Sequence, residues 1–129
     1  MYNDALAYQL SANKCKTNGC IYTIKSFQTD LYYIGSTYQP LYKRFFVHKS
    51  DFKNFHKTSK YISSFEILKY DDAFIEILEK TEHLDRSQLF KRENELIREN
   101  INSIVNVKGN THKKDEVHLN ELKELSKLR

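Results

Sequence analysis

Apolar and polar positions alternate in two short runs near the start of the chain. These runs cover residues 20–24 and 31–37 and are rich in tyrosine, isoleucine and threonine. Alternation of such residues with a period of two favours strands, and the polar segment 26–30 between the runs is turn-like. We therefore predict a β-hairpin. Two of the three glycines in the chain, Gly19 and Gly35, stand at its outer ends, which suggests that bare backbone is needed there.

Two helices and a third strand are predicted after the hairpin. Pro40, the only proline, is well placed in the first turn of a helix that runs to about Phe52. A second helix is expected over residues 58–69, because this segment begins at a cap rich in serine and threonine. The dense apolar content of residues 73–79 then predicts a strand in the centre of the sheet.

The next helix carries a carboxylate on its apolar side. Residues 85–88 resemble a capping box, and the helix is expected to reach about Asn102. Its apolar positions are Leu89, Phe90, Leu96, Ile97 and Ile101. Glu93 lies three or four residues from the first four of them, and desolvating an isolated carboxylate costs several kcal/mol. Glu93 is therefore either a metal-binding residue or a buried glutamate paired with an arginine such as Arg44.

Length and composition limit the class of protein. A chain of 129 residues is long enough for one ordinary domain with a proper core. It has no apolar run of the roughly 18 residues that a spanning helix needs, and its N-terminus does not resemble a secretory signal. We therefore expect an intracellular protein, cytoplasmic or nuclear, with no membrane partner. Cys15 and Cys20 are expected to be reduced thiols, and no second pair of ligands at zinc-finger spacing accompanies them.

The net charge of +4 is unevenly distributed along the chain. Residues 41–60 contain one acid, Asp51, against six cations, and phenylalanines interleave with the cations. Such a stripe is typical of a surface that follows a phosphate backbone, although a solvated helix face gives the same pattern. The candidate nucleic-acid-binding residues are Lys43, Lys49, Lys53, Lys57 and Lys60.

The two strand-like runs resemble the two halves of the signature of GIY-YIG nucleases. Cys20-Ile21-Tyr22 stands in place of Gly-Ile-Tyr, and Tyr33-Ile34-Gly35 matches the second half in full. The resemblance extends from about Gly19 to Asn106. It implies an α+β fold with a small three-stranded antiparallel sheet flanked by helices, and here an additional C-terminal helix.

The resemblance also implies a catalytic set. Its members would be Tyr22, Tyr33, Arg44, His48, Glu93 and Asn106. Arg44 and His48 are four residues apart on the predicted helix and so share one face. The implied reaction is metal-dependent hydrolysis of DNA, in which Tyr22 activates water and Arg44 steadies the phosphate. Glu93, within an Arg-Glu-Asn run, would hold one Mg²⁺ or Mn²⁺ per active site.

Three segments follow from these observations. Residues 1–18 are expected to be a leader or short helix, and residues 19–107 the nuclease-like domain. Residues 108–129 are expected to form a basic loop followed by an amphipathic helix from Glu116. Its apolar residues recur roughly every third position, at Val117, Leu119, Leu122, Leu125 and Leu128. This helix is expected to pack on the domain, to form a homodimer or to stay mobile. A partner protein that directs the chain to its DNA target is a further expectation.

Two other functions compete with the nuclease. The first is a nucleic-acid-binding module that keeps the fold but has weak or no turnover, because Cys20 replaces the usual glycine. The second is a structural or partner-binding protein that acts through its C-terminal helix. The nuclease and the binding module both predict DNA affinity that falls steeply as salt rises, whereas the structural or partner-binding protein does not.

Overall fold

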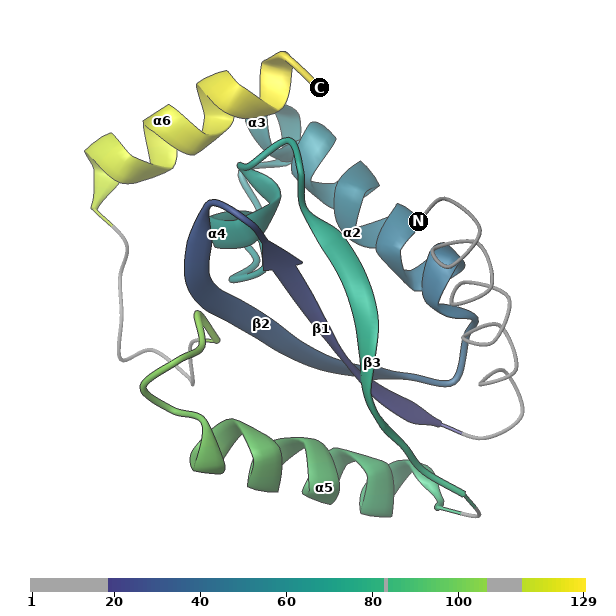
Figure 1. Ribbon diagram of the computed structural model, residues 1–129. Helices are drawn as coiled ribbons and strands as arrows, with labels where there is room; N and C mark the ends of the chain where they lie inside the picture. Colours follow the sequence, from purple (N-terminus) through teal and green to yellow (C-terminus); the bar gives the residue numbers. More distant parts are fainter. Residues whose placement is uncertain (1–18, 83, 107–114) are drawn as a thin grey trace.

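The computed structural model describes residues 19–82, 84–106 and 115–129. In chain order the elements are β1 (Cys20–Ser26), β2 (Thr29–Thr37), α2 (Leu41–Lys53), α3 (Phe55–Thr58), α4 (Phe65–Leu68), β3 (Phe74–Lys80), α5 (Arg86–Glu99) and α6 (Glu116–Lys127). This confirms the predicted α+β class, with an antiparallel three-stranded sheet, flanking helices and a C-terminal helix (Figure 1). The expected leader over residues 1–18 and most of the expected basic loop, residues 108–114, lie outside the described residues.

The strand order is β2-β1-β3, so β1 is the central strand and β3 an edge strand. The prediction that residues 73–79 lie in the centre of the sheet is therefore wrong. An apolar run shows that a strand is covered on its faces, but it does not show how many strands pair with it. In β3 only Ile75 is fully buried and Leu78 is 43% exposed, whereas nearly every residue of β1 is buried.

Helices cover both faces of the sheet and form two cores (Figure 1). On one face α2, α3 and α4 pack on the sheet around Tyr22, Ile24, Leu41, Phe52, Phe55 and Phe65. On the other face α5 packs on Ile21 and Ile34 through Leu89, Leu96 and Ile97. Successive residues of a strand point to opposite faces, so the hairpin supplies both cores at once.

The helices differ from expectation in two places. The predicted helix over 58–69 is wrong over most of its length: α3 ends at Thr58, before Ser59 with its left-handed φ of 57°, and only the short α4 is helical within that range. The capping box is confirmed: the Gln88 amide donates to Asp85 Oδ1 at 2.8 Å, and the Asp85 amide donates to Gln88 Oε1 at 2.9 Å. However, α5 ends at Glu99, and Phe90 is 56% exposed, so Phe90 is not part of the core.

The outer edge of β2 is partly covered by the segment after α5. The Tyr32 amide donates to the Ser103 carbonyl at 3.1 Å, and the Val105 amide donates to the Tyr32 carbonyl at 2.8 Å. The Asn106 side chain continues this pairing at Ile34. The hydrogen bonds of this segment to β2 therefore end one residue before Gly35.

The C-terminal helix α6 packs on the domain, beside α3 (Figure 1). Leu122 and Ser126 are buried, and the Ser126 hydroxyl accepts a hydrogen bond from the His56 amide at 3.2 Å. Val117 and Leu128 remain exposed. Among the described residues, no helix combines the length and apolar character needed to cross a membrane.

Candidate active site

The Tyr22 phenol lies at the centre of the candidate site. Tyr22 is fully buried in the middle of β1, on the face covered by α2. Its hydroxyl lies 2.7 Å from His48 Nε2, and Arg44 Nε donates to it at 3.1 Å. Arg44 and His48 are one turn apart on α2, so the predicted shared face brings both side chains to one oxygen.

His48 is held as a neutral imidazole. Burial and, to a smaller extent, the positive charge of Arg44 together lower its pKa to about 3. Its second nitrogen, Nδ1, lies 3.0 Å from the Ser64 hydroxyl. A neutral ring that donates from Nδ1 to Ser64 presents Nε2 as an acceptor for the Tyr22 proton, and this tautomer satisfies both contacts.

The pKa of His48 makes stability depend on pH. A folded-state value of about 3 lies below the usual value of about 6.5, so between these pH values only the unfolded chain binds the proton. The contribution of neutral His48 is therefore complete above about pH 6.5 and is lost progressively as pH falls toward 3. Urea denaturation gives the free energy of unfolding at each pH. In His48→Gln this free energy should decline with falling pH less steeply than in the wild type, by up to about 1.4 kcal/mol per pH unit. Parallel pH profiles for the two proteins would contradict a neutral buried His48.

Tyr33 flanks the same group from β2. Its ring centroid lies 6.4 Å from that of Tyr22 and 5.3 Å from that of His48. Burial raises the pKa of both phenols, while Arg44 lowers both to a smaller extent. Both tyrosines are therefore protonated at neutral pH, and a proton must leave Tyr22 before its oxygen can accept one.

Gly35 allows the phenol to occupy this position. It pairs with Tyr22 across the hairpin, and a Cβ atom at Gly35 would lie 2.4 Å from the Tyr22 hydroxyl oxygen and 2.5 Å from its Cζ. The glycine of the second motif is thus required by close approach of the ring.

Gly35→Ala should therefore displace Tyr22 from His48 and Arg44. We expect the DNA cleavage that the family resemblance implies to fall by about tenfold or more, and the free energy of unfolding to fall by about 1–3 kcal/mol, as for other overpacked cores. Plasmid nicking and urea denaturation measure the two effects. Gly19→Ala is the matched control for activity, because its Cβ would meet a flexible Leu89 methyl at 2.6 Å and does not touch Tyr22. Equal losses of activity in the two variants would contradict the role of Gly35.

Glu93 approaches the site from α5, on the other side of the sheet. It is half-buried and accepts a hydrogen bond from the Ser36 hydroxyl. Burial raises the pKa of Glu93, whereas the Ser36 hydrogen bond and the charge of Arg44 lower it. The positive charge of Arg44 therefore favours the ionised form of Glu93, while the Arg44 guanidinium donates a hydrogen bond to Tyr22.

A cleft of about 420 Å³ opens at the end of β2, beside Arg44 and Ser36, and neither Tyr22 nor Glu93 is among its lining residues. It is lined by Ser36, Thr37, Tyr38, Gln39, Arg44, Arg86, Leu89 and Phe90. Arg44 reaches it from α2, and Ser36 carries the hydrogen bond to Glu93. A phosphate in this cleft can thus meet the guanidinium and lie near the carboxylate.

The carboxylate fits a site for a hard divalent cation. Among the residues that the structure describes, no three His, Cys, Asp or Glu side chains form a group able to hold a metal ion. Mg²⁺ does not need such a group, because it keeps several waters and binds through one or two carboxylates together with substrate phosphates. Glu93, with the Ser36 hydroxyl beside it, provides the oxygen donors for such a site.

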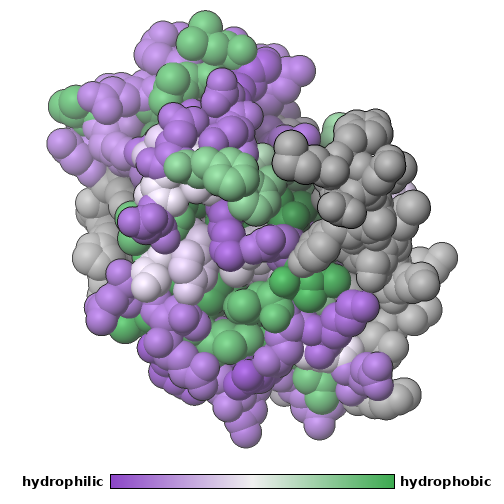
Figure 2. Space-filling view, in the orientation of Figure 1, coloured by the Kyte–Doolittle hydropathy of each residue, from purple (hydrophilic) through white to green (hydrophobic). Residues whose placement is uncertain are grey.

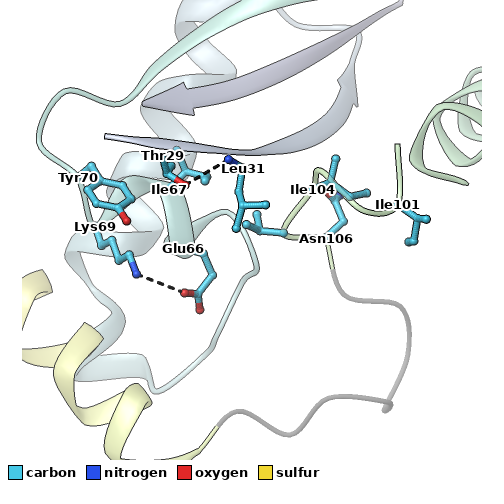
Figure 3. Close-up of a pocket in the computed structure, with 10 residues that line it drawn as sticks. Thr29, Leu31, Glu66, Ile67, Lys69, Tyr70, Ile101, Ile104 and Asn106 are labelled. Atoms are coloured by element: carbon cyan, nitrogen blue, oxygen red, sulfur yellow. Dashed lines mark hydrogen bonds and ion pairs between the residues drawn. The ribbon is translucent and has the colours of Figure 1, made fainter. Parts of the chain in front are cut away.

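Asn106 holds the backbone of β2 in place. Its Oδ1 accepts from the Ile34 amide at 2.9 Å, and its Nδ2 donates to the Ile34 carbonyl at 2.7 Å. Both polar atoms of the Asn106 side chain therefore bond to the backbone of Ile34, the residue between Tyr33 and Gly35. Asn106 also lines a separate cavity of about 410 Å³ near Glu66 (Figure 3). None of Tyr22, Arg44 and Glu93 lines that cavity.

The predicted DNA-binding lysines are all exposed, and two of those on α2 lie on other faces of the helix than Arg44. Lys43, Lys49 and Lys53 lie on α2, Lys57 lies on α3, and Lys60 lies in the connection after it. At 100° per residue, Lys53 is about 180° around the helix from Arg44. Lys49 is about 140° from Arg44, and its ammonium lies over the Phe45 ring.

Two hydroxyl groups of the site were not singled out as functional residues by the sequence. Ser64 orients His48, and Ser36 donates to Glu93. Ser36 does have a sequence signal, since it is the residue after the second motif and must point to the face opposite Gly35. Ser64 has no such signal, because its contact with His48 depends on how α4 packs against α2.

A family model described as the GIY-YIG catalytic domain matches residues 18–104. The matched segment contains both strand motifs, Arg44, His48 and Glu93, and ends before Asn106. Neither curated proteins nor solved structures gave a match to the chain. With its hairpin, its antiparallel sheet and this match over most of its length, the chain belongs to the GIY-YIG family and carries the nuclease-type catalytic domain of that family.

Proposed function

We propose that this protein is a DNA endonuclease that hydrolyses phosphodiester bonds with the help of a divalent metal ion. The observation that carries the proposal is the position of the Tyr22 hydroxyl between Arg44 Nε and His48 Nε2, over the bare backbone of Gly35. A structural core tyrosine needs neither a guanidinium nor an imidazole on its oxygen. A general base needs both a group that takes its proton and a cation that stabilises its anion.

In this proposal the attacking water gives a proton to the Tyr22 oxygen as the Tyr22 proton moves to His48 Nε2. The water oxygen forms the new bond to phosphorus, and the bond from phosphorus to the departing deoxyribose oxygen breaks as that oxygen takes up a proton from solvent. Arg44 contacts the phosphate, whose negative charge reduces the effect of the guanidinium on His48 and so favours protonation of the imidazole. Tyr33, on the neighbouring strand β2, holds the water or the phosphate.

Glu93 is the proposed ligand of Mg²⁺ or Mn²⁺, and such an ion would stabilise the negative charge on the leaving oxygen. Ser36 orients the carboxylate, since its hydroxyl donates to Oε1. Asn106 is proposed to act as a positioning residue that fixes β2 between Tyr33 and Gly35.

The position of Cys20 favours the enzyme over the inactive binding module. Its side chain is fully buried and packs in the core on the α2 face. Close packing at this end of β1 falls on Gly19 instead, where an added Cβ would lie 2.6 Å from a Leu89 methyl and whose carbonyl accepts from the Thr81 amide at 3.1 Å. Cys20 is therefore accommodated without displacing Tyr22.

Nicking of supercoiled plasmid DNA tests the proposal. The full chain should convert it to the open circular form with Mg²⁺ or Mn²⁺ and should not do so with EDTA. Salt-sensitive DNA binding without nicking in either ion would instead identify the binding module. An absence of salt-sensitive binding would favour a structural or partner-binding protein.

A further inference from the structure

A second cleft runs along the outer surface of α5 and adjoins the active-site cleft. It has a volume of about 740 Å³ and is lined by Arg86, Ser87, Phe90, Lys91, Asn94 and Arg98. Arg86 and Phe90 line both clefts, so the two share a wall. We call the six lining residues the α5 surface. In Figure 2 the lower part of the molecule, where α5 lies in Figure 1, is mostly hydrophilic with small apolar patches.

The α5 surface is positively charged, because no acid of the helix is among its lining residues. Its lining contains three cations and no carboxylate. Glu93 turns to Ser36, and Glu95 lines a different cleft together with Arg92. Arg92 is itself paired with Glu79 of β3, at 2.7 and 2.8 Å. Lys91 borders the cleft of Glu95 as well, whereas Arg86 and Arg98 line only clefts without a carboxylate. The α5 surface therefore attracts an anionic partner.

Phe90 is 56% exposed on the wall shared by the two clefts. An exposed phenyl ring between cations is the arrangement with which proteins bind single-stranded nucleic acid, since every base can stack on an aromatic face. In an intact duplex the bases stack on one another, and a protein ring at the phosphate backbone has no partner. The position of Phe90 thus favours a strand with at least one unpaired base.

We propose that the α5 surface binds the substrate DNA strand on one side of the scissile phosphate, with Phe90 stacking on an unpaired base. Arg86, Lys91 and Arg98 contact the phosphates, and Asn94 lies within the same surface to bind a base edge or sugar. From Arg86 to Arg98 the helix rises about 18 Å, which is the length of roughly five nucleotides of one strand. This inference rests on the proposed nuclease function and gives its substrate a structural preference for unpaired bases near the cut.

Binding measurements with uncleaved DNA test the inference. The full chain carrying Glu93→Gln is titrated, in EDTA, into a labelled duplex with a single-stranded overhang and into the matched blunt duplex. Adding Phe90→Ala should weaken binding to the overhang DNA by about tenfold and leave blunt-duplex binding unchanged, and Phe90→Tyr should restore it. Adding Arg98→Gln should weaken binding to both DNAs. It should also reduce the slope of log affinity against log salt concentration by about one, the loss of one phosphate contact.

Two variants serve as matched controls. Phe27→Ala removes an aromatic side chain that is 85% exposed at the β1–β2 turn, and Lys127→Gln removes a charge on α6. Both should bind the overhang DNA as the parent does. Unchanged binding by Phe90→Ala and Arg98→Gln, or an equal effect of Phe90→Ala on both DNAs, would overturn the inference.

Failure of this inference is distinguishable from failure of the proposed function. If the wild-type chain nicks plasmid while the α5 variants bind DNA as their parent does, the nuclease stands and the α5 surface does not bind substrate. If the wild-type chain does not nick, a selective loss of overhang binding in Phe90→Ala still supports the α5 surface as a DNA-binding site.

Discussion

Glu93→Gln is expected to reduce plasmid nicking by about a thousandfold without unfolding the protein. A metal-binding carboxylate supplies several kcal/mol of transition-state stabilisation through its ion, and each 1.36 kcal/mol is a factor of ten in rate. Glutamine keeps an oxygen that can accept the Ser36 hydrogen bond. Because burial raises the pKa of Glu93, the charged form is not what stabilises the fold here. Urea denaturation should therefore show no loss of stability beyond about 1 kcal/mol.

Glu95→Gln is the matched control for this experiment. It removes one carboxylate from the same helix, two residues away, where Glu95 lines the cleft beside Arg92 and not the active-site cleft. Nicking by Glu95→Gln should remain within about twofold of the wild-type rate. Full activity in Glu93→Gln would contradict the metal site, and equal losses in both variants would point to a general electrostatic effect of the helix.

Local features of the sequence predicted most of the secondary structure. The hairpin follows from alternating apolar positions, and α2 begins right after Pro40, as expected. The capping box at residues 85–88 also forms as predicted. Each of these features depends on residues only a few positions apart, so it can be predicted from the local sequence.

Features that depend on distant parts of the chain were not predictable in the same way. The order β2-β1-β3 reflects which strands pair, and the apolar content of β3 does not encode this. The break at Ser59 requires a left-handed conformation that serine does not favour, so tertiary packing must hold it. The exposure of Phe90 depends in turn on where α5 meets the sheet.

The candidate site shows the same division. The spacing of Arg44 and His48 already placed them on one face, and their contact with one phenol agrees with this. The hydroxyl partners Ser36 and Ser64 come from segments separated by 57 and 16 positions from the residues they contact. Such partners emerge only from the fold.

Tyr22→Phe is expected to reduce nicking by about 10²–10⁴-fold, the usual range for loss of a general base. The phenylalanine ring fills the same space over Gly35, so the sheet is retained. It leaves His48 Nε2 and Arg44 Nε without the oxygen that now joins them, and we expect the free energy of unfolding to fall by about 1–3 kcal/mol. Activity measured at protein concentrations and temperatures where both forms are folded separates the two effects.

Tyr32→Phe is the matched control, because it removes a phenolic hydroxyl from the neighbouring strand. That hydroxyl donates to Asn100 Oδ1 at 3.0 Å, and the Tyr32 ring packs with the α5 core, on the face opposite Tyr22. A loss of stability with nearly full activity is expected there. If Tyr22→Phe instead nicks DNA as fast as Tyr32→Phe, the phenol is not the base. The contacts of its oxygen with Arg44 and His48 would then only position those two side chains, and another group of the site would have to activate the water.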